Sequence, residues 1–96
     1  MPLEAADLKN LEASLADRIY MQIAGWHLYL GDAGLAETLA IECSARVDQG
    51  ADVAARQSLE AVQVSLAGGS TRLPLARLVP AGQLFDMEEI LEPYCR

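Results

Sequence analysis

The chain has 96 residues, of which 52% are hydrophobic and 22% are charged. That length accommodates one domain with a modest core, and the composition excludes an intrinsically disordered chain. Seven Lys and Arg residues stand against fourteen Asp and Glu residues, so the formal net charge at pH 7 is −7. Because a phosphate backbone requires a basic surface, we expect no nucleic-acid partner. We predict a single domain that spans residues 1–96.

The N-terminus has neither the basic start nor the apolar run of a signal peptide. The longest stretch without a charged residue, 19–31, is too short and too polar to cross a bilayer. Cys43 and Cys95 are the two cysteines, and two such distant thiols do not make a disulfide framework. We therefore predict a cytoplasmic protein that does not attach to membranes, with Cys43 as a small buried hydrophobe and Cys95 as an incidental thiol.

The first segment has the apolar spacing of an amphipathic helix. Large aliphatic residues recur every three or four positions at Leu8, Leu11, Leu15, Ile19 and Ile23. This pattern predicts a helix from about Leu3 to about Tyr29, in which Gly25 is the weak point. On such a helix Trp26 lies beside the buried stripe, so we expect a mostly buried indole that fills the hinge before the next helix. His27 is turned by about 100° and is expected to be exposed.

Two further helices are predicted after this hinge. Gly31 fits the position just after a helix end, and Asp32 fits the cap of the next helix. The apolar stripe over residues 35–47 predicts that helix, which Gln49-Gly50 ends. An alanine-rich segment predicts a shorter helix from Val53 to about Leu59.

The apolar period then changes to that of a strand. Residues 62–66 alternate apolar and polar, and the dipeptide Gly68-Gly69 suits a tight hairpin turn because both positions tolerate positive φ. Folding the chain back at this dipeptide pairs Leu66 with Thr71, Val64 with Leu73 and Val62 with Leu75. Pro74 lies on the other face and has no N–H to donate, which predicts that its strand is an edge strand.

The last segment returns to helical spacing after Pro80 and Gly82. Its apolar residues run from Leu84 to Tyr94, Pro93 ends it, and its outer face is acidic, with Asp86, Glu88, Glu89 and Glu92. Because an isolated two-stranded hairpin is marginally stable in water, its apolar face is expected to pack on the helices. We therefore predict the α+β class, with three or four helices packed on a single two-stranded antiparallel β-hairpin.

Few residues are suited to catalysis or metal binding. His27, Cys43 and Cys95 are the only His and Cys residues and form no close pair, whereas structural zinc takes about four such ligands. Gly68-Gly69 lies between predicted strands instead of before a helix, so it indicates a turn and not a phosphate loop. The acidic face of the last helix lacks the ligand spacing of a calcium loop. We predict no catalytic residue, no metal site and no cofactor.

The segment from Trp26 to Asp32 is the most unusual stretch of the sequence. It contains the only Trp, the only His and one of the three Tyr residues of an aromatic-poor chain. Such a concentration is typical of a binding hot spot. Trp26, His27, Tyr29 and Asp32 are therefore our candidate contacts with a partner or ligand, and a purely structural role for Trp26 in the hinge is the alternative.

Three blocks of sequence carry a resemblance to a known family. They are Trp26-His27-Leu28-Tyr29-Leu30-Gly31-Asp32-Ala33, then Val62-Gln63-Val64-Ser65-Leu66 with Gly68-Gly69, Leu73-Pro74-Leu75 and Leu78-Val79-Pro80, and last Met87-Glu88-Glu89-Ile90-Leu91-Glu92. In these blocks the chain resembles a small cyanobacterial family of roughly 90–100 residues, catalogued as a domain of unknown function. It departs from the family at Ser70, where family members often have a basic residue, which weakens an anion-binding interpretation. The resemblance implies a cytoplasmic cyanobacterial protein and transfers no catalytic residue.

Two hypotheses from different classes remain. The first is a small acidic, non-catalytic interaction domain with a protein partner, since an edge strand can accept a strand from a partner or, in a homodimer, from a second copy. The alternative is a small-ligand-binding domain or minor enzyme, which would need His27 and a carboxylate such as Asp32 in a pocket lined by Trp26 and Tyr29. Attachment to a membrane surface is disfavoured because residues 19–30 lack flanking Lys and Arg.

Overall fold

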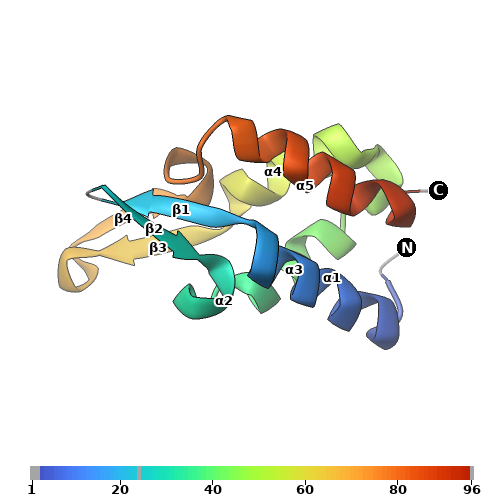
Figure 1. Cartoon of the computed structure of the whole chain (residues 1–96), viewed down its shortest axis with the longest axis horizontal. Helices are drawn as coiled ribbons and strands as arrows, with labels where there is room; N and C mark the ends of the chain where they lie inside the picture. Colours follow the sequence, from blue (N-terminus) through green and yellow to red (C-terminus); the bar gives the residue numbers. More distant parts are fainter. Residues whose placement is uncertain (1–2, 24, 96) are drawn as a thin grey trace.

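A computed structural model describes residues 3–23 and 25–95 (Figure 1). The described residues form five α-helices: α1 (Ala5–Arg18), α2 (Leu30–Ala33), α3 (Ala36–Ser44), α4 (Ala51–Ala61) and α5 (Gly82–Leu91). They also form two antiparallel hairpins, with the strands β1 (Tyr20–Ile23), β2 (Trp26–Tyr29), β3 (Gln63–Leu66) and β4 (Thr71–Pro74). The predicted α+β class is confirmed, and one of the two hairpins was not predicted.

The helices and the hairpins occupy opposite ends of an elongated molecule. The principal extents are 38 × 23 × 20 Å. Figure 1 shows both described chain ends at the helical end, beside α1 and α5, and the loops of both hairpins at the other end. The hairpins therefore project from a helical body, which leaves much of their surface in contact with solvent.

The core lies mainly between α1, α3, α4 and α5. Its fully buried side chains include Leu11 and Leu15 of α1, Leu39 and Cys43 of α3, and Met87 of α5. Burying one such aliphatic side chain stabilises a fold by about 1.5–3 kcal/mol. The apolar stripes predicted from the sequence supply these residues, and the burial of Cys43 is confirmed.

The predicted β3–β4 hairpin is confirmed together with its register. Val64 pairs with Leu73 and Leu66 pairs with Thr71. The Leu75 N–H donates to the Val62 carbonyl at 2.8 Å, which continues the ladder to the third predicted pair. Gly68 and Gly69 have φ of 70° and 92°, the positive values that a tight hairpin turn requires. Pro74 lies in β4, whose one strand neighbour is β3.

The predicted helix from about Leu3 to about Tyr29 is wrong beyond Arg18. α1 ends at Arg18, and the following residues form the β1–β2 hairpin, in which Ile23 pairs with Trp26. Gly25 lies in the intervening loop with φ +85°, a conformation that no α-helix contains. The segment is dense in β-branched and aromatic residues, which favour a pleated surface over a helix.

Two boundaries also differ from the prediction. Asp32 does not cap the second predicted helix, because it lies in the first turn of the short α2, and α3 begins after Leu35. The predicted 35–47 helix ends at Ser44 and is followed by a 3-10 turn at Val47–Gln49. Gly50, with φ +100°, separates this turn from α4, so the chain does break at the predicted dipeptide, although α3 itself ends earlier. α5 and a 3-10 turn, Glu92–Tyr94, form the predicted last helix.

Candidate functional site

The β1–β2 hairpin has two faces of different chemistry. Side chains directly opposite each other in an antiparallel ladder share a face, and successive side chains alternate between faces. The register therefore places one apolar set together, consisting of Met21, Ile23, Trp26 and Leu28. The other face consists of Tyr20, Gln22, His27 and Tyr29.

The second face is an ordered aromatic cluster on the surface. The rings of Tyr20 and His27 stack with their centroids 4.6 Å apart, and Tyr29 meets Tyr20 edge-on at 5.6 Å. The Gln22 side-chain Nε2 lies 2.8 Å from His27 Nε2, so the two side chains form a hydrogen bond on this face. His27 is exposed, as predicted, and its bonding partner is Gln22 and not Asp32.

The predicted burial of Trp26 is wrong. Its side chain is 77% exposed. Trp26 follows the loop of a projecting hairpin, where the strand periodicity no longer aligns it with the buried stripe of α1. Leu28 and Tyr29 are also 36% and 43% exposed, so β2 presents three large apolar or aromatic side chains to solvent.

An open groove separates the two hairpins and has a volume of about 440 Å³. One wall is the apolar face of β1–β2, and the others are β3 and the end of α2 with the residues that follow it. The groove is lined by Met21, Ile23, Leu28, Ala33, Leu35, Gln63, Val64, Ser65 and Leu66. Trp26, His27, Tyr29 and Asp32 do not line this groove. This groove is therefore not the pocket lined by Trp26 and Tyr29 that the ligand-binding hypothesis needs.

The outer edge of β1 is covered by the rest of the protein. The Tyr20 N–H donates to Gln83 Oε1 at 3.1 Å, and the Gln22 N–H donates to the Leu78 carbonyl at 2.8 Å. Gln83 is itself buried on α5 and donates from Nε2 to Asp86 Oδ2 at 2.8 Å. Both outward N–H groups of β1 are thus bonded to residues outside the hairpin.

The outer edge of β2 is open. The Leu30 N–H donates to the Ile19 carbonyl at 3.0 Å, so Ile19 and Leu30 form a hydrogen-bonded pair of the ladder. Hydrogen-bonded and non-hydrogen-bonded pairs alternate along an antiparallel ladder, and His27 and Tyr29 belong to non-hydrogen-bonded pairs. Their N–H groups therefore point away from β1. Within the described ranges neither N–H has a partner. Soluble proteins usually protect such edges with charged side chains, prolines or bulges, and β2 has none of these.

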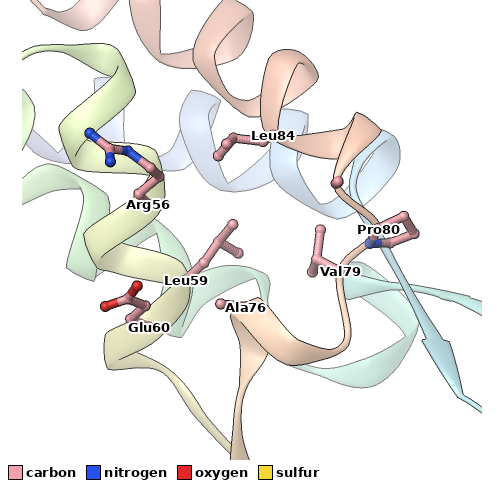
Figure 2. A pocket seen from close by; sticks show the side chains of 8 residues that line it. Arg56, Leu59, Glu60, Ala76, Val79, Pro80 and Leu84 are labelled. Atoms are coloured by element: carbon pink, nitrogen blue, oxygen red, sulfur yellow. The ribbon is translucent and has the colours of Figure 1, made fainter.

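A second, smaller pocket of about 130 Å³ lies between α4, α5 and the loop before α5. Figure 2 shows Leu59, Leu84 and Val79 around the pocket, while the charged groups of Arg56 and Glu60 extend away from it along α4. The wall of the pocket is therefore mainly apolar, with Arg56 and Glu60 at its margin.

The buried thiol of Cys43 is not suited to nucleophilic chemistry. Burial raises its pKa to about 11, and the neighbouring Ser58 hydroxyl and the Arg46 charge lower the pKa by less than burial raises it. Ser58 Oγ is buried and has no hydrogen-bond partner of good geometry within the described part of the chain. Among residues 3–23 and 25–95, no group of three His, Cys, Asp or Glu side chains is placed to hold a metal ion.

A family model for proteins of unknown function, DUF3181, matches residues 8–94, which include both hairpins and almost all of the helical body. The chain belongs to the DUF3181 family. This agrees with the family of unknown function indicated by the three sequence blocks. No curated protein and no solved structure matches this DUF3181 chain. None of its described helices is long and apolar enough to cross a membrane.

Sequence reasoning identified the segment of the DUF3181 chain that carries the exposed aromatic residues but missed the open strand edge. The edge depends on Gln83 and Leu78, which are distant in sequence and cover β1 and not β2. One local signal was available, namely the density of Ile, Tyr, Trp and Met residues around Gly25. That signal predicts a hairpin without indicating which edge is covered.

Proposed function

We propose that this chain is a non-catalytic, cytoplasmic protein-interaction domain that binds another protein chain through β2. The observation that carries the proposal is the contrast between the covered edge of β1 and the open, uncharged edge of β2. Strand addition to an open edge gives affinity through main-chain hydrogen bonds and specificity through alternate side chains. The exposed Trp26, Leu28 and Tyr29 supply those side chains.

Charge supports the same surface. Residues 19–35 and 62–81 contain three charged residues, Asp32, Arg72 and Arg77, and therefore have a net charge of +1. Because the whole chain has a net charge of −7, the remaining residues have a net charge of −8. A protein partner can thus approach the hairpin end without the repulsion or strong counterion binding that the acidic helical body imposes. Interface cores are depleted of charged residues and enriched in aromatic ones, as β2 is.

The test is site-specific photo-crosslinking in cells that express the full chain. A photoreactive phenylalanine analogue replaces Trp26 in one variant and Phe85 in the control, because Phe85 on α5 is 75% exposed and lies outside the hairpins. We expect discrete protein adducts from position 26 that are lost when Leu28 is also changed to Asp, and few adducts from position 85. Adducts of equal yield from both positions, or none from position 26, would contradict the proposal.

A further inference from the structure

We infer that the partner at this edge is a second copy of the chain. In this arrangement, which rests on the proposed function, the two β2 strands pair antiparallel about a two-fold axis that passes between the two copies of Leu28. The two hairpins then form one continuous sheet with the strand order β1, β2, β2 of the partner and β1 of the partner. A two-fold interface of this kind uses the same residues from both copies.

The hydrogen-bonding pattern of β2 permits this register. The outward-facing groups belong to His27 and Tyr29, which are two residues apart. With the axis at Leu28, His27 of one copy lies opposite Tyr29 of the other, and each such pair exchanges two main-chain hydrogen bonds. The Tyr29 carbonyl also lies at the start of α2, and its oxygen has two lone pairs, so it can accept from both sides. The outward N–H groups of His27 and Tyr29 thereby obtain acceptors.

The side chains are self-complementary in the same register. Leu28 lies opposite its own copy on the apolar face, and Trp26 of one chain lies diagonal to Leu28 of the other, within reach of its large ring. On the other face, His27 lies opposite Tyr29 of the second copy, which extends the Tyr20–His27 stack across the axis. No charged side chain is opposed to another, since β2 contains none.

Charge favours contact between two copies at the hairpin end over contact between their helical bodies. Two chains of net charge −7 repel each other, and contact between their helical bodies would bring most of that charge together. The hairpin end, with its net charge of +1 over residues 19–35 and 62–81, is the surface where two copies meet with the least repulsion. An uncharged β2 also lacks the complementary charges that would select a charged segment of another protein.

The β3–β4 hairpin offers a poorer edge. The Leu75-to-Val62 hydrogen bond fixes the alternation of this ladder, so Arg72 and Pro74 direct their main-chain groups outward from β4. Pro74 has no N–H and Arg72 carries a charge, which are two features that prevent strand addition. The pairing is therefore assigned to β2 and not to β4.

The test is sedimentation equilibrium of the full chain from about 5 to about 500 μM, the range in which a weak dimer with a small interface dissociates. His27→Pro removes an N–H that the isolated chain does not use, so the β1–β2 ladder keeps its hydrogen bonds. His27→Ala is the matched control, because it removes the imidazole and keeps the N–H. Ser65→Pro removes an outward N–H from β3 in the same way. Leu28→Lys places two ammonium groups across the axis and tests the register without proline.

We expect a monomer–dimer equilibrium whose dissociation constant rises at least about tenfold in His27→Pro and in Leu28→Lys. Ser65→Pro is expected to change it about threefold or less. His27→Ala loses the ring contact with Tyr29 of the second copy but keeps the N–H, so it should raise the dissociation constant by less than His27→Pro does. Far-UV circular dichroism checks that each variant is folded, and if His27→Pro is not, Leu28→Lys decides. A chain that is monomeric up to the highest concentration, or a dimer that Leu28→Lys leaves intact, overturns the inference. If the chain is monomeric and position 26 still crosslinks to a different protein, the proposed function stands without the second copy; if neither is seen, both fail.

Discussion

The two hairpins have strands of equal length and glycines of positive φ in their loops, yet their edges differ. In β1–β2 one edge is bonded to Gln83 and Leu78, and the other is open, uncharged and flanked by exposed aromatic residues. In β3–β4 the edge strand β4 carries Arg72 and Pro74. The difference indicates that β4 is protected against pairing by its own sequence, whereas β2 is left available for it.

The largest expected effect distinguishes the anchor of the first hairpin from its tip. Leu30, which is fully buried where β2 meets α2, connects the hairpin to the core. Leu30→Ala should lower the free energy of unfolding by about 2–5 kcal/mol, the usual cost of such a cavity. Trp26→Ala should change it by less than about 0.5 kcal/mol because the indole is 77% exposed. Urea denaturation measures both, and a large loss for Trp26→Ala would place the indole in the core.

The next effect concerns the covered edge of β1. Gln83→Leu removes the acceptor of the Tyr20 N–H and should cost about 1–3 kcal/mol, since that partly buried donor is left without a partner. Gln22→Leu is a matched control, because the Gln22 side chain bonds His27 on the exposed face, and it should cost about 0.5 kcal/mol or less. Equal effects of the two changes in thermal unfolding would show that α5 does not hold β1.

The smallest effect compares the two loops. Gly25→Ala and Gly68→Ala should each destabilise the chain by about 1 kcal/mol, because alanine is strained at φ +85° and +70° while its Cβ meets no neighbour in either place. Gly82→Ala at the start of α5 also meets no neighbour and lacks the positive φ. It should be neutral or stabilising by up to about 1 kcal/mol. A neutral Gly25→Ala would indicate that the first loop does not have this turn.

The second hairpin was predictable because its local signals agree. The alternation of Val62, Val64 and Leu66 leads directly into a Gly-Gly dipeptide, and folding the chain there gives one register without adjustment. In the first hairpin the signals conflict. Ile19 and Ile23 continue the helical stripe of α1, so a period of 3.6 residues fits the sequence as far as Gly25. The hydrogen bonds from β1 to Gln83 and Leu78 stabilise the strand instead, and these partners are distant in sequence.

The candidate site shows the same limit. The composition of the segment from Trp26 to Tyr29 was enough to select it. His27 is exposed as predicted, although the prediction used a helical position that the structure replaces with a strand. The exposure of Trp26 could not be predicted correctly from a helical period, because side chains on one face repeat every 3.6 residues in a helix but every two residues in a strand. In the strand, Trp26 is therefore no longer placed next to the buried stripe of α1. The availability of the β2 edge depends on which strand the helical body covers, and no local pattern contains that information.

Amide hydrogen exchange, resolved by residue in NMR spectra, tests the central contrast most directly. At low concentration, where the chain is monomeric, we predict slow exchange for Tyr20 and Gln22, whose N–H groups bond Gln83 and Leu78, and fast exchange for His27 and Tyr29. At high concentration the exchange of His27 and Tyr29 should slow as the two β2 strands pair. Uniformly slow exchange from residue 19 to residue 29 at low concentration, as a continuous helix gives, or fast exchange at Tyr20 and Gln22, would contradict the account.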